Sequence, residues 1–279
     1  MNKNIFQSLI FAAIVLGLSY LVFWGPIVFL NLKAANLIEG KIYNPVAFTM
    51  FVLGGFVPSV VGIILTCIVE GRRGFNALMA SAINVRIGYR SWLSIFGYVL
   101  ILAILQVALF SCLGGKFDST KFLVQLPTII PLIVLGPLSE KFGWRGFLQK
   151  RLNNVFNPFL SSIFIGCVWS FWHLPLFYMN GASQHEFGIP FLSFLVSVSS
   201  SAFVYTYIFQ VSKGSLFSAI LLHWIGTYVM QVIGSQVYAQ KIANYNLMES
   251  IPTVVLAGVF VLLIRKSAIN KTQYQNNPT

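Results

Sequence analysis

Long apolar runs constrain the fold of this chain more than any other feature. A helix needs roughly 20 apolar residues to cross a membrane, and eight runs of about that length are separated by short polar segments. The backbone inside lipid must satisfy its own hydrogen bonds, which favours helices. The sequence therefore predicts an all-α, polytopic membrane protein of about eight transmembrane helices, at residues 5–30, 45–69, 91–112, 122–139, 157–179, 189–210, 214–234 and 251–265.

The composition excludes a water-soluble globule. Hydrophobic residues make up 57% of the 279 residues and charged residues only 9%, whereas a soluble domain carries about 25% charged residues. The first apolar run is longer than the roughly 7–15 residues of a signal-peptide core, so we expect a retained first span. Cys67, Cys112 and Cys167 lie in apolar stretches and match no metal or redox spacing, so we expect them to pack.

The basic residues predict the orientation. The net charge of +12 does not indicate a nucleic acid partner, because Lys and Arg are scattered through the loops. When the N-terminus is placed inside, most of them fall in inside segments, and this bias sets topology. We therefore expect a multi-pass protein of the plasma membrane with both termini cytoplasmic and with lipid as a partner. The basic segment 71–90 is either an amphipathic surface helix or an ordinary loop.

We expect one transmembrane domain over residues 1–265, with a core bearing the chemistry at about 120–235, and a polar cytoplasmic tail over 266–279. Ionisable side chains within spans are costly and mark function by default. Here Glu140 and Arg145 fall at the end of the fourth run, His173 in the fifth and His223 in the seventh. Each has an ordinary explanation alone, as an ion-paired acid, a basic anchor or a satisfied core histidine. Three spans that each carry such a group predict a shared, buried polar cavity.

The residue types in this cavity suit peptide hydrolysis. A carboxylate that loses its water in an apolar pocket holds a proton more tightly and can serve as a general base. Glu140, helped by His173, would take a proton from water, and His223 with Thr227, four residues later on the same helix face, would stabilise the oxyanion. Alternatively, Glu140, His173 and His223 would bind a catalytic zinc. Spacing alone does not separate the two.

These residues resemble the CAAX-protease and bacteriocin-processing (CPBP, Abi) family of intramembrane endopeptidases. The family pattern Glu-Glu-x-x-x-Arg, Phe-x-x-x-His and His-x-x-x-Asn corresponds here to Glu140-Lys-Phe-Gly-Trp-Arg145, Trp169-Ser-Phe-Trp-His173 and His223-Trp-Ile-Gly-Thr227. The resemblance covers about 120–235. It implies a cavity open to the cytoplasm, a metal-free site with Glu140, His173, His223, Thr227 and Arg145, and a hydrophobic or membrane-tethered peptide substrate. Family members also act in bacteriocin maturation and self-immunity.

Lys141 is the main departure from this pattern, since it replaces an acid beside Glu140. If its ammonium stays close, it weakens Glu140 as a base. Alternatively, it points away and snorkels to the cytoplasm. Two rivals to the endopeptidase therefore stand: a catalytically inactive relative that acts as a membrane scaffold or immunity protein, and a transporter with a buried proton path. The sequence shows no repeat of the kind found in transporters, which disfavours the last.

Overall fold

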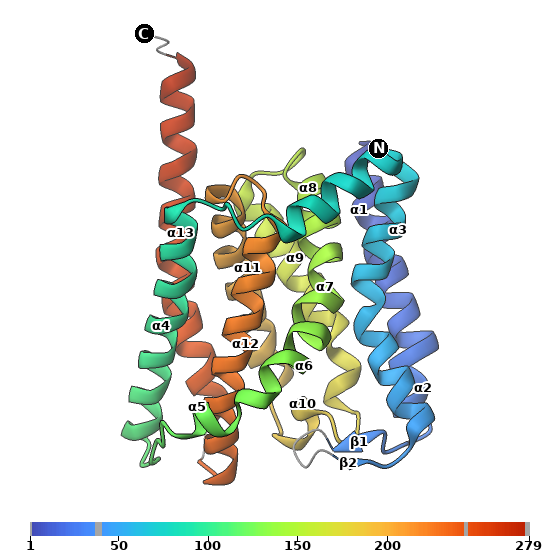
Figure 1. The fold of residues 1–279 in the computed structure, drawn as a ribbon, viewed down its shortest axis with the longest axis vertical. Coiled ribbons are helices and arrows are strands. Elements are labelled where there is room, and N and C mark those ends of the chain that lie inside the picture. Colours follow the sequence, from blue (N-terminus) through green and yellow to red (C-terminus); the bar gives the residue numbers. More distant parts are fainter. Residues whose placement is uncertain (1, 37–40, 243–244, 277–279) are drawn as a thin grey trace.

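The fold is a bundle of long helices (Figure 1), as the apolar runs predict. The computed structural model describes residues 2–36, 41–242 and 245–276. Within these described residues, five helices are long and apolar enough to cross a membrane. They are the continuous helix formed by α1 (Lys3–Leu18), η1 (Ser19–Phe23) and α2 (Trp24–Phe29), then α3 (Pro45–Ile83), α4 (Tyr89–Cys112), α11 (Phe191–Val211) and α12 (Leu216–Ala239). The chain is a multi-pass membrane protein.

The fourth predicted span is longer and less regular than expected. Instead of ending at residue 139, a helical path with α, 3-10 and π turns runs almost unbroken through residue 152. Prolines at 127, 131 and 137 contribute to this irregularity, because each removes a backbone donor. We call residues 121–152 the irregular span. It consists of α5 (Lys121–Val124), η2 (Leu126–Thr128), α6 (Ile129–Ile133), η3 (Val134–Leu138), α7 (Ser139–Lys141), η4 (Phe142–Leu148) and α8 (Gln149–Leu152).

Two other predicted spans differ from simple crossing helices. The run 157–179 forms α9 (Pro158–Trp172), followed by the 3-10 turn η5 (Leu174–Phe177) and the short α10 (Ser183–Glu186). At 1.5 Å per residue, the 15 residues of α9 extend only about 22 Å. The run 251–265 lies within α13 (Tyr245–Asn276), which continues past the predicted end. The five clear spans do not confirm the total of eight.

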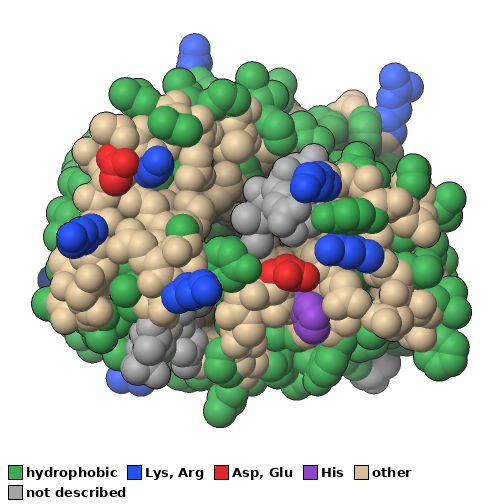
Figure 2. All heavy atoms as spheres, turned by 90° about the horizontal axis from the view of Figure 1, so that it is seen from below, with side chains coloured by type: hydrophobic (Ala, Val, Ile, Leu, Met, Phe, Trp, Pro, Cys, Tyr) green, Lys and Arg blue, Asp and Glu red, His purple; other side chains and the backbone are tan. Residues whose placement is uncertain are grey.

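The two ends of the bundle differ. The terminal end, at the top of Figure 1, holds the start of α1, α8 and the end of α13. The hairpin end, at the bottom, holds α5, α10 and the antiparallel pair of β1 (Ala35–Asn36) and β2 (Lys41–Ile42). Figure 2 shows the hairpin end, where acidic and basic side chains are both present and some lie side by side. Both chain termini thus lie at one end, as the predicted orientation requires.

A bend in α3 creates a surface segment at the terminal end. Gly71 has φ 63° and ψ −160°, a conformation that costs little only for glycine. Beyond it, residues 72–83 are helical and run across the terminal end (Figure 1). Buried Leu78 packs there with Leu216 and Ile220 of α12. The helical alternative for segment 71–90 therefore holds for residues 72–83, whereas residues 84–88 are not helical.

The sides of the bundle are apolar and face outward. Leu21, Ile68 and Leu192 are among many large hydrophobic side chains that are more than two-thirds exposed, which suits contact with lipid rather than water. Cys67 and Cys112 are also free and exposed. The expectation that these two cysteines pack in the interior was wrong.

Backbone contact positions the irregular span against α3. A Cβ atom added to Gly143 would lie 2.1 Å from the Pro58 carbonyl oxygen, and one added to Gly62 would lie 2.5 Å from the Gly143 Cα. Small residues allow this approach between membrane helices. Aromatic packing continues the interface, since Trp144 lies 5.3 Å from Phe11, measured between ring centroids.

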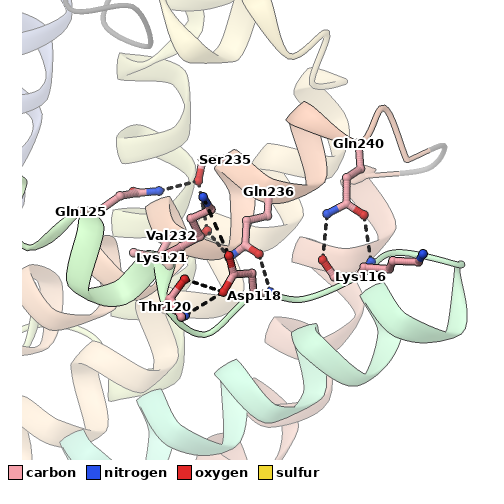
Figure 3. A network of polar contacts seen from close by, with 9 residues as sticks. All are labelled: Lys116, Asp118, Thr120, Lys121, Gln125, Val232, Ser235, Gln236 and Gln240. Atoms are coloured by element: carbon pink, nitrogen blue, oxygen red, sulfur yellow. Dashed lines mark hydrogen bonds and ion pairs between the residues drawn. The ribbon is translucent and has the colours of Figure 1, made fainter.

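A polar network fastens the hairpin end of the irregular span to α12 (Figure 3). The Gln240 side chain pairs with both backbone groups of Lys116, at 2.8 Å each. Gln236 Oε1 accepts from the Asp118 amide at 2.8 Å, and Gln125 Nε2 donates to Ser235 Oγ at 2.8 Å. Hydrogen bonds from the Thr120 hydroxyl and amide hold the pKa of Asp118 below its usual value. The network fixes where the irregular span enters the bundle.

We expect Gln236→Leu to loosen this attachment. The change removes the acceptor of the Asp118 amide, and a lost hydrogen bond is worth about 1 kcal/mol, so exchange of that amide should accelerate by roughly fivefold. Hydrogen exchange measured by mass spectrometry on peptides covering 113–125 checks this. Gln184→Leu, at the same end but outside the network, is the matched control. Equal exchange in the two variants would show that the network does not hold the segment.

Candidate active site

Glu140 lies inside the bundle, which corrects the prediction that it sits at the end of a span. Its side chain is 6% exposed, and Lys141 and Arg145 are fully buried. The π turn of η3 precedes Glu140, and Pro137 lacks the amide for regular helix bonding. The Ser139 hydroxyl instead lies 2.8 Å from the Leu135 carbonyl and 2.7 Å from that of Gly136. The Ser139 hydroxyl thus replaces part of the missing backbone hydrogen bonding in the segment that carries Glu140.

Lys141 stays beside Glu140 rather than snorkelling. Its Nζ lies 3.2 Å from Glu140 Oε2. The same ammonium lies 3.9 Å from the ring centroid of Trp169 and 4.8 Å from that of Tyr205, distances at which an aromatic face attracts a cation. The structure therefore decides between the two sequence alternatives in favour of the buried ion pair.

Arg145 is part of the same interior and not an anchor at the membrane surface. Its Nη1 donates to Gln149 Oε1 at 2.9 Å, and Gln149 Nε2 donates to the Thr206 hydroxyl at 3.2 Å. Its Cζ lies 4.7 Å from the Tyr205 ring centroid. The chain of contacts joins the irregular span to α11. The positive-inside reading of Arg145 does not fit this position, because its side chain is fully buried within the bundle.

His173 caps α9 instead of lying within it. The helix ends at Trp172 because the following Leu174-Pro175 disfavours continued α conformation. His173 Nδ1 lies 2.9 Å from the Trp169 carbonyl oxygen, and the ring centroid lies 4.5 Å from that of Trp172. A helix too short to cross the hydrocarbon layer thus leaves its C-terminal imidazole at membrane depth.

His223, on α12, faces the same cluster. Its ring centroid lies 6.1 Å from that of Trp169 and 6.4 Å from that of Tyr205. Its Nδ1 is buried with no hydrogen-bond partner among the described residues. An added Cβ at Gly136 would lie 3.7 Å from His223 Nε2, so the glycine of η3 borders the imidazole. Thr227 follows one helical turn later and is half-buried.

The cluster centres on the Trp169 indole. Lys141, His173 and His223 each lie within 6.2 Å of that ring centroid, and Glu140 is close enough to His173 for their charges to interact. The irregular span, α9, α11 and α12 therefore meet at one place. Sequence reasoning missed Tyr205, Gln149 and Thr206, because polar residues of these types are common in membrane helices and carry no motif.

The donor set for the zinc alternative does not fit. In the part of the chain that the structure describes, no three His, Cys, Asp or Glu side chains are grouped so that they could hold one metal ion. Glu140 directs an oxygen at the Lys141 ammonium instead. We therefore derive no step through a metal.

Comparison with known families bears on these residues directly. Residues 122–229 match the family described as type II CAAX prenyl endopeptidase Rce1-like. This chain carries an Rce1-like region. The match extends from the irregular span to α12, so the region contains each side chain of the cluster. The Rce1-like family comprises CAAX-type intramembrane peptidases.

Two curated relatives support the Rce1-like assignment. CAAX prenyl protease 2 of Methanococcus maripaludis is 28% identical over 127 residues, which cover 43% of this chain and 44% of that protein. Lysostaphin resistance protein A of Staphylococcus haemolyticus is 25% identical over 175 residues, which cover 61% of this chain and 43% of that protein. The chain thus spans less than half the length of either relative. The resemblance stated from the motifs is confirmed.

Proposed function

We propose that this protein is an intramembrane endopeptidase that hydrolyses a peptide bond in a hydrophobic or membrane-tethered peptide. One observation carries the proposal: three separate helical segments bring His173, His223 and Lys141 to Trp169. The buried carboxylate of Glu140 pairs with Lys141 at this place. Burial of so many ionisable groups at membrane depth is costly unless they serve a function.

The proposed reaction needs only these side chains and water. Glu140, assisted by His173, takes a proton from the water, whose oxygen then bonds to the peptide carbonyl carbon. His223 and Thr227 donate hydrogen bonds to the resulting oxyanion. The carbon–nitrogen bond breaks as Glu140 returns the proton to the leaving amine, which yields a new carboxyl terminus and a free amine. Arg145 positions the irregular span through Gln149 and Thr206.

We propose further that both termini are cytoplasmic in the plasma membrane. Lys3, Lys150 and Arg265 belong to segments that lie with the termini at the terminal end (Figure 1), which supports this orientation through the positive-inside rule. The substrate then belongs to that membrane or reaches the site through it. A role in bacteriocin maturation or self-immunity is one setting for such a peptidase. The named resistance protein among the relatives supports that setting.

The ion pair between Glu140 and Lys141 favours a second candidate, a catalytically inactive relative that binds a peptide or partner protein. An ammonium 3.2 Å from the carboxylate stabilises its charge and weakens it as a base. Lys141→Glu restores the acidic pair of the family pattern. If the unaltered protein fails to cut and this variant cuts, Lys141 is what silences the site.

Reconstitution tests the endopeptidase directly. The purified protein in lipid vesicles should cut one of a set of membrane-anchored peptides, and mass spectrometry of the products should locate the bond. His173→Ala should lower the rate by about 10²-fold or more, because a group that assists proton transfer contributes on that scale. His185→Ala, a histidine in α10 at the hairpin end, is the matched control and should leave the rate unchanged.

A chelator should not alter the rate. Since the three candidate ligands are not grouped to hold a metal ion, we expect the same product yield after dialysis against EDTA as before it. The measurement compares initial rates with and without the chelator, and after zinc is added back. Loss of cleavage that zinc restores would overturn the metal-free mechanism in favour of a zinc peptidase.

A further inference from the structure

A polar pocket at the terminal end lies outside the candidate active site. Its volume is about 540 Å³, and it is formed by the start of α1, the part of α3 just before the bend at Gly71, and α8 with the turn that follows. The lining side chains that matter here are Lys3, Asn4, Glu70, Lys150, Arg151 and Asn153. A pocket of this size is comparable to small-molecule sites, which occupy roughly 300–1,000 Å³.

The lining carries a surplus of positive charge. Glu70 is the one acid among the lining residues, and its Oε1 lies 2.5 Å from Nη2 of the almost fully buried Arg151. That pairing leaves the charges of Lys3 and Lys150 in excess. The N-terminus of α1, a helix of 16 residues, adds the positive end of its dipole at the same place. The side-chain amides of Asn4 and Asn153 are further hydrogen-bond donors for an anion.

The helices that form the pocket also carry apolar side chains on their outward faces. Phe6 and Leu9 lie on α1 just beyond Lys3, and Ile68 precedes Glu70 on α3; these three apolar side chains are 48%, 46% and 73% exposed. A ligand held here would therefore contact cationic groups at the membrane surface and hydrocarbon below. At the hairpin end, by contrast, acidic side chains lie beside basic ones (Figure 2), and Asp118 pairs with Lys121. The combination of a cationic pocket and adjoining apolar helix faces suits an amphiphile with an anionic head.

We propose that this pocket binds the phosphate-bearing headgroup of an anionic phospholipid, with its acyl chains along α1 and α3. Lys3 and Lys150 neutralise the phosphate, and the amides of Asn4 and Asn153 donate to its oxygens. Basic pockets between transmembrane helices are suited to lipid headgroups of this kind. The bound lipid joins α1, α3 and α8, so it stabilises the folded bundle by mass action. This inference does not depend on peptidase activity.

Lipid-dependent stability tests the proposal. The full-length protein is placed in nanodiscs of phosphatidylcholine alone or with increasing phosphatidylglycerol, and its Tm is measured. We expect the unaltered protein to gain stability with phosphatidylglycerol. In the Lys3→Gln/Lys150→Gln variant, the phosphatidylglycerol concentration needed for the same gain in Tm should rise by about tenfold or more. Each lysine contributes to the attraction between the pocket and the anionic headgroup. Lys266→Gln, an exposed lysine in α13 near the terminal end, is the matched control and should respond like the unaltered protein.

Three outcomes would overturn the proposal. The first is an unaltered protein whose Tm is the same with and without phosphatidylglycerol, a measurement that needs no variant to fold. The second is a double variant that responds to the anionic lipid as the Lys266→Gln control does. The third is equal stabilisation by soluble glycerol 3-phosphate in phosphatidylcholine nanodiscs, which would assign the pocket to a free phosphate compound instead of a lipid.

Discussion

Glu140→Gln should abolish peptide cleavage while leaving the shape of the side chain intact. The amide cannot accept the proton of the attacking water, and a positioned base contributes on the order of 10²–10⁴ in rate. We expect product formation by the reconstituted protein to fall by about 10³-fold. Glu186→Gln, an acid in α10 at the hairpin end, is the control and should cut at the normal rate.

The same substitution should also destabilise the protein, because it leaves the fully buried Lys141 ammonium without its carboxylate. Removing one partner of a buried ion pair costs about 3–5 kcal/mol. Replacing both charges is much less costly, so Glu140→Gln/Lys141→Met should recover most of the lost Tm. This double variant separates chemistry from folding. If it is stable and still cuts at the normal rate, Glu140 is not the base.

If the protein is instead a catalytically inactive relative, the same variants should give a different result from the one expected for an endopeptidase. If neither the unaltered protein nor the variants cut any peptide, while the biological effect persists in the stable double variant, the cluster serves binding or structure. Lys141→Glu then completes the comparison, since it tests whether the acidic pair of the family pattern restores cleavage.

Gly143→Ala should destabilise the protein strongly, because the added methyl group meets the backbone of another helix. The new Cβ would lie 2.1 Å from the carbonyl oxygen and 2.6 Å from the carbonyl carbon of Pro58. These are backbone atoms of α3, so no rotamer change relieves the clash and the two helices must separate. Overpacking costs about 1–3 kcal/mol and occasionally more, which corresponds to a fall in Tm of roughly 5–10 °C for a chain of this size.

Gly97→Ala is the matched control for this substitution. Gly97 lies in α4, and an added Cβ meets nothing within 4 Å. Because alanine is the better helix former by about 1 kcal/mol, this variant should be as stable as the unaltered protein or more so. Since α3 supports the segment that carries Glu140, Gly143→Ala should also slow cleavage. Equal Tm values for the two variants would contradict the close contact between α3 and η4.

The sequence predicts the helical membrane fold well, because the length of each apolar run is visible in consecutive residues and does not depend on how distant segments pack. Three short motifs in order also indicate the resemblance to the Rce1-like family, whose model matches residues 122–229. The end of the fourth span was misplaced for a physical reason. Glu140 and Arg145 were placed at the end of the span, whereas Glu140 pairs with Lys141 against aromatic rings and Arg145 donates to Gln149 within the bundle.

The sequence could suggest that the side chains of the candidate site come together, but it could not establish that they do. Trp169 and His173 share a chain segment, but their approach to Lys141 and to His223 depends on how distant helices pack. No local pattern indicates that Tyr205 of α11 lies against both buried cations. The roles of the individual site residues, Thr227 included, stay predictions that the substitutions above address.

The π turn of η3, immediately before Glu140, makes the chain intolerant of a further insertion there. A π turn holds one residue more than the α turn it replaces. Inserting one more residue within 134–138, beyond the one that the π turn already accommodates, would rotate everything after it by about 100° relative to the preceding part. The carboxylate would then turn away from both imidazoles, although every residue of the three motifs would still be present in the chain.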